Sequence, residues 1–234
     1  MVDPLYAAFL ALDLLCATLT GMVAFFFLRM SRAFPGRGHG VLAAGFGIGA
    51  VSYLTVATSI FGLGRAFLGI DAIRAAGILL GTLLIFLNYT FRRFRAPMPT
   101  LSAVSGAVSL VAGVFIGLYV LSGPGGAFSL PPAMEYIPWF RTLEFFLLVG
   151  SALLVAESVR PRSLRDYRVP LAFLLLALDR YTVALALFHG PPYELSLQGI
   201  LLDTVFSYTW RVLGLLLLLT VVMPPLRRWF PAEA

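Results

Sequence analysis

The sequence predicts an all-α membrane protein: a bundle of seven transmembrane helices with its N-terminus outside and its C-terminus in the cytoplasm. Seven apolar stretches occupy most of the 234 residues, and arginines are concentrated in every second connection between them. A helix needs about 20 mostly apolar residues to cross a bilayer, because each residue advances it by about 1.5 Å. Only 12% of the residues are charged, against about 25% in soluble domains.

The expected spans follow one another through short connections rich in glycine, proline and arginine. In order they are Leu5–Leu28, Val41–Phe61, Ala72–Thr90, Leu101–Leu121, Pro138–Ala156, Pro170–Phe188 and Leu197–Val222. We expect the first to be a retained span, because Asp3 stands where a signal peptide has basic residues and no convincing cleavage site follows. The expected organisation is one membrane domain, residues 1–234, with no soluble domain.

The distribution of arginines sets the expected orientation. The connections after the first, third and fifth spans, together with the C-terminal tail, hold 12 of the 17 arginines. The opposite side holds only Arg65, Arg74 and Arg141. Because basic loops stay in the cytoplasm, the N-terminus is expected outside, in a multi-pass protein of the plasma membrane. The +6 net charge therefore indicates topology, and we expect the bilayer rather than nucleic acid as the partner.

An internal repeat is one interpretation of the order of the spans. A shift of 128 positions aligns the first two spans with the fifth and sixth, and superposes Arg32 on Arg160 and Tyr53 on Tyr181. Two groups of three spans around a linker span would form a 3+1+3 parallel repeat. Chance similarity between two leucine- and alanine-rich segments is the alternative.

Small residues recur every four positions in two of the spans. They are Ser105, Ser109, Gly113 and Gly117 in the fourth span, and Gly45 and Gly49 in the second. Such stripes let helix backbones approach closely within a membrane. We expect helix packing within one bundle, with a contact between copies of the chain as the alternative.

Five ionisable residues lie deep within the expected spans: Asp13, Asp179, Arg180, Asp203 and Arg211. Each costs about 2.5–3.5 kcal/mol to insert unless it is paired or hydrated, so an intramembrane charge indicates a function by default. All but Arg211 fall within about 9–14 Å of the outer boundary, counted along the helices. The sequence therefore predicts a polar pocket in the outer half of the membrane.

Helical spacing extends this predicted pocket. Asp203, Ser207 and Arg211 repeat every four residues on one face of the last span, with Tyr208 alongside. The predicted ligand- or ion-binding residues are Asp13, Tyr53, Asp179, Arg180, Tyr181, Asp203, Ser207, Tyr208 and Arg211.

The expected partners within the pocket follow from depth and helical direction. Asp179 and Arg180 point about 100° apart, so we expect them not to pair with each other. Arg180 is expected to pair with Asp13 or Asp203, and Asp179 to face a tyrosine, a hydroxyl or water. Arg211 is expected to reach Asn88 and Tyr89, or Asp203.

Three aspartates against two arginines leave one acid in surplus, which suits a proton or a cation. A satisfied network that only fixes helix register is the alternative interpretation. Arg141 and Glu144 are expected to form an interfacial salt bridge at the outer mouth of the fifth span.

The sequence offers little for catalysis, metal or cofactor binding. His39 and His189 lie on opposite sides of the expected membrane, and Cys16 is the only cysteine. They cannot form a metal cluster or ligate one haem together, and no nucleotide-binding motif is present. We therefore expect no enzymatic activity, no metal and no cofactor.

Two known architectures resemble this one in part. Seven spans with Asp203 in the last resemble a microbial rhodopsin, but the chain has no lysine to form a retinal Schiff base. The 3+1+3 order resembles SWEET-type sugar transporters and PnuC-type vitamin transporters. Their proline-glutamine and tryptophan-rich motifs are absent here, so the resemblance covers architecture alone.

The predicted function is that of a small non-enzymatic transporter or a bundle that binds a small molecule or an ion. One alternative is a structural subunit of a larger membrane complex, or a homo-oligomer. Another is a seven-span receptor that signals through a separate partner.

The orientation is testable by labelling introduced cysteines with a membrane-impermeant reagent. A Ser129→Cys variant should react from outside intact cells, whereas a Ser163→Cys variant should react only after the cytoplasm is opened, because the arginine-rich connections face inward. The reverse pattern would overturn the predicted topology.

Overall fold

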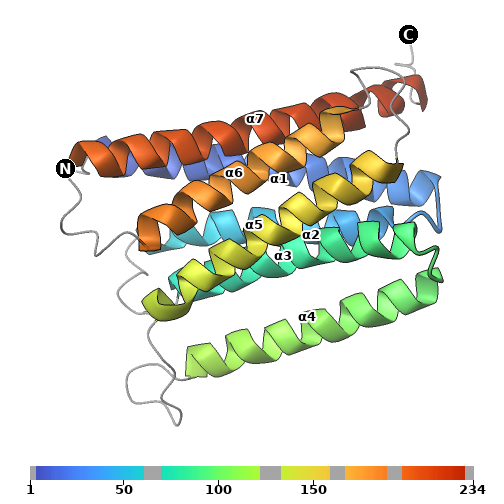
Figure 1. Cartoon of the computed structure of the whole chain (residues 1–234), viewed down its shortest axis with the longest axis horizontal. Coiled ribbons are helices and arrows are strands. Elements are labelled where there is room, and N and C mark those ends of the chain that lie inside the picture. The colour runs from blue at the N-terminus through green and yellow to red at the C-terminus, as the bar shows by residue number, and fades with distance from the viewer. Residues whose placement is uncertain (1–3, 61–69, 122–132, 159–166, 189–196, 230–234) are drawn as a thin grey trace.

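The computed structural model describes residues 4–60, 70–121, 133–158, 167–188 and 197–229. These ranges hold seven helices: α1 (Pro4–Ala33), α2 (His39–Ile60), α3 (Ile70–Arg93), α4 (Met98–Leu121), α5 (Ala133–Ser158), α6 (Arg168–Phe188) and α7 (Leu197–Trp229). They run roughly along the long axis of the molecule, so that α1 begins at the opposite end from the end of α7 (Figure 1). Ser129 and Ser163 lie outside the described residues.

The helices are those of a polytopic membrane protein. Within the described residues, five segments are long and apolar enough to cross a bilayer: Leu10–Ala33, Arg74–Arg93, Met98–Phe115, Ile137–Ser158 and Val205–Met223. Helix α2 contributes a shorter apolar segment, His39–Thr55. The apolar sequence of helix α6 is interrupted by charged residues, namely Arg168, Asp179 and Arg180. The prediction that all seven helices span the membrane stays a prediction.

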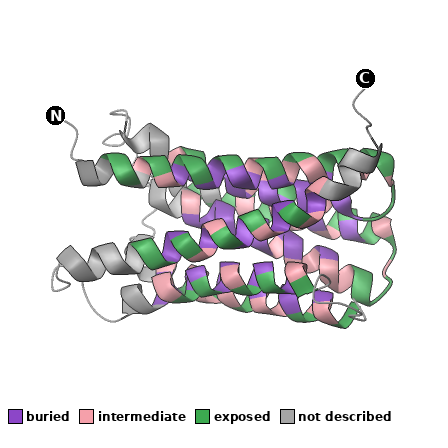
Figure 2. Cartoon of the chain, turned by 90° about the horizontal axis from the view of Figure 1, so that it is seen from above, coloured by how far each residue is buried: buried purple, intermediate pink, exposed green. Residues whose placement is uncertain are grey.

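Large apolar side chains cover the outer surface of the helices. Leu110 is 70% exposed, Trp139 64% and Phe146 62%. Figure 2 shows exposed residues on the outer faces of the helices and buried residues along the faces that meet. Water would disfavour so much exposed apolar surface, whereas lipid covers it at no cost.

The packing core joins every helix except α4. Helices α1, α2 and α3 pack in sequence, as do α5, α6 and α7, and the two groups meet where α3 contacts α5 and α1 contacts α7. Val23, Phe173 and Leu218 lie in this core and are almost fully buried. Helix α4 lies at the edge of the bundle and packs mainly against α3 (Figure 1).

The two small-residue stripes have different roles. A Cβ atom added at Gly81 would lie 2.5 Å from the carbonyl oxygen of Gly45, so the backbones of α2 and α3 touch there. This confirms close packing at Gly45. On α4, by contrast, a Cβ at Gly113 or Gly117 would meet nothing within 4 Å. The expectation that this half of the α4 stripe packs within the bundle is therefore wrong.

A tight turn joins α3 to α4. Arg95 adopts a left-handed backbone conformation with φ of 52°, and the amide of Ala96 donates to the carbonyl of Phe91 at 3.0 Å. This arrangement satisfies the last carbonyls of α3, and Pro97 cannot continue that helix. The chain therefore reverses within a few residues.

Candidate functional site: a buried charge cluster

Seven charged side chains from five helices form one buried charge cluster. Its members are Asp13 on α1, Arg74 on α3, Arg141 and Glu144 on α5, Asp179 and Arg180 on α6, and Arg211 on α7. Six of them are no more than 7% exposed, and only Arg74, with 20% of its side chain exposed, is partly accessible. Tyr53 on α2 and Ser207 and Tyr208 on α7 complete the site.

Asp179 lies at the centre of the cluster and is fully buried. Arg211 donates to both of its carboxylate oxygens, from Nε at 2.9 Å and from Nη2 at 2.9 Å. The hydroxyl of Ser207 donates to the same carboxylate, and Nη2 of Arg180 lies 3.5 Å from it. Such a two-pronged arginine–carboxylate pair fixes geometry as well as charge, so it locks α6 against α7.

Glu144 forms the second junction. It is fully buried and accepts from Nη1 of Arg141 on both oxygens, at 3.0 and 2.8 Å. Arg180 approaches the same carboxylate with its Nε atom at 3.0 Å. With its other end, Arg180 donates to the hydroxyl of Tyr53 at 2.6 Å. These contacts connect α2, α5 and α6.

Asp13 forms the third junction and brings in α1 and α3. Nη2 of Arg74 donates to its Oδ1 atom at 2.8 Å, and the hydroxyl of Tyr208 donates to the same oxygen at 2.8 Å. Nη1 of Arg211 lies 4.0 Å from that oxygen, which links Asp13 to the pair around Asp179.

The cluster is therefore a continuous chain of alternating charges. In order, its members are Arg74, Asp13, Arg211, Asp179, Arg180, Glu144 and Arg141. The chain begins and ends with arginine, so four guanidinium groups face three carboxylates among the described side chains. This part of the site carries one positive charge in excess.

Several buried donors in the cluster lack acceptors. Among the described side chains, no hydrogen-bond partner is found for Arg74 Nε, Arg141 Nε and Arg211 Nη1. An unmet buried N–H group is costly, and more so when it is charged. Aromatic rings compensate part of this cost at Arg211, whose guanidinium lies 5.0 Å from the ring centre of Tyr53 and 4.7 Å from that of Tyr208.

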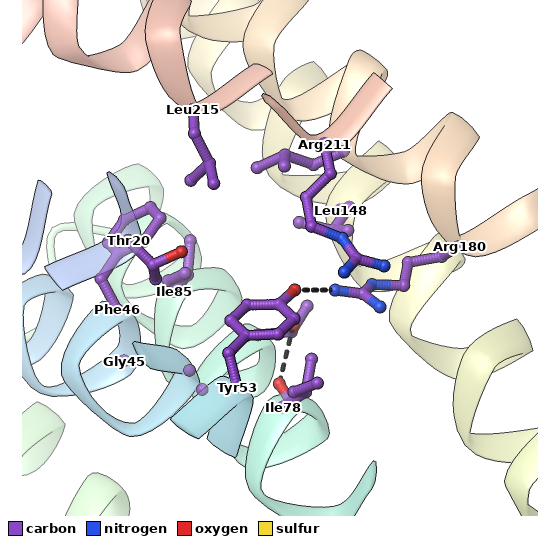
Figure 3. A pocket seen from close by; sticks show the side chains of 14 residues that line it. Thr20, Gly45, Phe46, Tyr53, Ile78, Ile85, Leu148, Arg180, Arg211 and Leu215 are labelled. Atoms are coloured by element: carbon purple, nitrogen blue, oxygen red, sulfur yellow. Dashed lines mark hydrogen bonds between the residues drawn. The ribbon is translucent and has the colours of Figure 1, made fainter. Parts of the chain in front are cut away.

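A small cavity adjoins the cluster in the middle of the bundle. Its volume is about 50 Å³, and it is lined by Arg180, Arg211 and Tyr53 at one end and by apolar side chains and small residues elsewhere. The two guanidinium groups and the Tyr53 hydroxyl converge at this end, facing Leu215 and Ile85 (Figure 3). Because one water needs about 10–15 Å³, the cavity has room for a few waters or one small ion.

The structure confirms some of the predicted geometry. Ser207 and Arg211 are both 4% exposed and face the bundle interior, and Tyr208 and Tyr53 are buried beside them. Aspartates pair with arginines of other helices, as Asp13 does with Arg74 and Asp179 with Arg211. The side chain of Asp203 lies outside the described residues. The predicted role of these residues in ligand binding stays a prediction.

Other predicted contacts are wrong, while those of Arg180 and Arg211 with Asp203 stay predictions. Arg180 pairs with Glu144 rather than Asp13, and it also approaches its neighbour Asp179, because a long guanidinium side chain can bend back across the angle between them. Arg211 pairs with Asp179 instead of reaching Asn88, which is buried with no hydrogen-bond partner among the described residues. Tyr181 is 46% exposed and packs against Phe145 outside the pocket.

Three members of the cluster were not expected there. The arginine distribution places Arg74 on the outer side of the membrane, and the sequence places Arg141 and Glu144 at the outer mouth of the fifth span. Helix α5 begins at Ala133, and Arg141 and Glu144 lie on the face of this helix that meets Arg180 of α6. The spacing of Arg141 and Glu144 is visible in the sequence, but their burial depends on which face of α5 meets α6. Their inclusion turns the expected surplus of acid into a surplus of arginine among the described side chains.

These features define the class as a helical polytopic membrane protein with an ionic cluster in its core. The chain matches no protein-family model, and no curated protein or solved structure is significantly similar to it.

Removing the central carboxylate should be the most damaging single change. Asp179→Asn leaves Arg211 buried without its counter-charge, so we expect a loss of about 3–5 kcal/mol in unfolding free energy. The matched control is Glu157→Gln, since Glu157 pairs with Arg93 at 2.9 Å where both side chains are more than half exposed. That change should cost about 1 kcal/mol or less. Denaturant unfolding in detergent measures both, and equal losses would contradict the central place of Asp179.

Proposed function

We propose that this protein binds a small solute or ion at the buried charge cluster and transports it across the membrane, without chemical conversion. The observation that carries the proposal is the cavity of about 50 Å³ between Arg180, Arg211 and Tyr53. A network that served only to hold helices together would gain from filling this space and satisfying every donor. Here Nη1 of Arg211, a residue that lines the cavity, has no hydrogen-bond partner among the described side chains, which suits an occupant that can be exchanged.

The proposed membrane architecture has seven spans with the N-terminus outside, in the plasma membrane. The start of α1 and the end of α7 lie at opposite ends of the bundle, which agrees with an odd number of crossings (Figure 1). The cluster includes Asp13 near the start of α1 and Tyr53 near the end of α2. With this orientation, the proposed binding site lies in the outer half of the bilayer.

A 3+1+3 repeat is part of the proposed architecture. Its support is the packing of α1–α3 and α5–α7 as two sequential groups, with α4 at the edge. The two halves contribute differently to the site, because Tyr53 is 5% exposed and Tyr181 is 46% exposed. If the helices are duplicated, the two halves have diverged. The half α5–α7 supplies three of the four arginines of the cluster, and the half α1–α3 supplies Tyr53.

A structural subunit of a larger membrane complex is the second candidate function. It is favoured by α4, whose open positions Gly113 and Gly117 would let the helix of a partner subunit approach closely. Purification without harsh detergent separates the candidates: a stoichiometric partner released by Gly113→Leu supports the subunit, and a lone protomer supports the transporter. The receptor interpretation stays a prediction.

Transport is testable in liposomes that contain the purified chain. The fluxes of sodium, potassium, chloride and formate are measured separately. At least one of them should be faster than in liposomes without the protein. Arg180→Gln and Arg211→Gln should abolish it, because both guanidinium groups line the cavity. Arg93→Gln, in the exposed pair with Glu157, should leave it unchanged.

Size-exclusion chromatography identifies variants that fold, and only folded variants are compared. If flux through folded Arg180→Gln and Arg211→Gln equals that of the unmodified chain, the cluster is not the transport site. Absence of any flux, together with a stoichiometric partner, would favour the subunit.

A further inference from the structure

The sign of the charge excess indicates which kind of solute the cavity accepts. Among the described side chains, the alternating chain from Arg74 to Arg141 ends in arginine on both sides and carries one net positive charge. In a medium of low dielectric constant, an uncompensated charge is far more costly than in water. An anion in the cavity would neutralise the excess, whereas a cation would double it.

The unmet donors agree with the charge. Nη1 of Arg211 has no hydrogen-bond acceptor among the described side chains, and the residue lines the cavity while being 4% exposed. Arg180 reaches the same cavity, and its Nη2 atom donates to the Tyr53 hydroxyl. That hydroxyl therefore keeps its own proton to donate. The cavity end thus offers donors from three directions (Figure 3).

The carboxylates of the cluster are not placed to bind a cation in the cavity. Asp179 accepts from Arg211 and Ser207, and Glu144 accepts twice from Arg141 while Arg180 lies at 3.0 Å. None of the acidic members of the cluster lines the cavity, while two of its arginines do. A cation entering this space would meet guanidinium groups and a hydroxyl that is already engaged.

We infer that the cavity binds a small monovalent anion, held by Arg211, Arg180 and the hydroxyl of Tyr53. This inference rests on the proposed function and specifies its solute class. The volume of about 50 Å³ suits an inorganic anion the size of a halide or a carboxylate as small as formate. Guanidinium groups suit either, because they bind carboxylates in two-pronged pairs and halides as donors.

Thermal stability of the whole chain in detergent tests this inference. The sodium salts of chloride, bromide, formate and gluconate are compared at constant ionic strength. A ligand that binds only the folded state raises the Tm as its concentration rises. Chloride, bromide or formate should raise it, and the more effective ion distinguishes a halide site from a carboxylate site. Gluconate, which is too large for the cavity, should not raise it.

Two glycine variants provide a matched control. Gly49 lines the cavity, and a Cβ there would rest 3.5 Å from Thr20, an ordinary contact, so Gly49→Ala should fold and weaken the anion effect. Gly47 is on the same helix but does not line this cavity, and a Cβ there meets nothing within 4 Å. Gly47→Ala should therefore retain the full effect.

A charge variant tests the sign directly. Asp13→Asn adds one positive charge to the cluster, so its Tm should depend more steeply on chloride or formate than that of the unmodified chain. Bromide should also give an anomalous-scattering peak beside Nη1 of Arg211.

Stabilisation by sodium, potassium or lithium gluconate, with none by chloride, bromide or formate, would overturn the anion inference and leave the proposed binding pocket standing. An anion effect that is equal in Gly49→Ala and Gly47→Ala, without a bromide peak, would also overturn it. The flux measurements above then decide separately whether the pocket transports any solute.

Discussion

A charge within a bilayer needs an opposite charge beside it, and this requirement organises the core of the protein. Each unpaired arginine or aspartate at the centre of a span costs about 2.5–3.5 kcal/mol. The described charges reduce this cost by forming one series of alternating positive and negative side chains from Arg74 to Arg141. Every inner member of the series has an opposite charge on both sides. Pairing alone is weak evidence of stability, because desolvation offsets much of the attraction. The stronger effect of pairing is on specificity, because other arrangements of the helices would leave charges unpaired and would have a higher free energy.

The helices that share this series are the ones that pack together. Five helices supply the charges and α2 supplies Tyr53, so each depends on a partner elsewhere in the bundle. Helix α4 supplies none of the described members of the cluster and lies at the edge. Where α2 and α3 meet, Gly45 and Gly81 bring the backbones into contact. Gly45 and Gly81 line the same small cavity as Arg180 and Arg211.

The sequence predicted a membrane environment, the helices and several of the buried charged residues. It did not predict which charged residues pair with one another. Composition and periodicity were sufficient for the predicted features because they depend on local sequence alone. Partners depend on the rotation of each helix about its axis, and the rotation of α5 buries Glu144 against Arg180 of α6. Arginine adds a further difficulty, since its long side chain reaches groups that helical direction would exclude. The contact between Arg180 and Asp179 shows this. The predicted surplus of acid was wrong for the described side chains because it counted only five residues deep within the expected spans and left out Arg74, Arg141 and Glu144.

The central claim is that the charges act as one connected unit, and a double-mutant cycle between Asp13→Asn and Glu144→Gln tests it most directly. Within the series, these two carboxylates are connected through Arg211, Asp179 and Arg180. Each change raises the same positive excess, so the loss of unfolding free energy in the double variant should exceed the sum of the single losses by more than about 0.5 kcal/mol. Losses that add within about 0.3–0.5 kcal/mol would show independent pairs and would contradict the account.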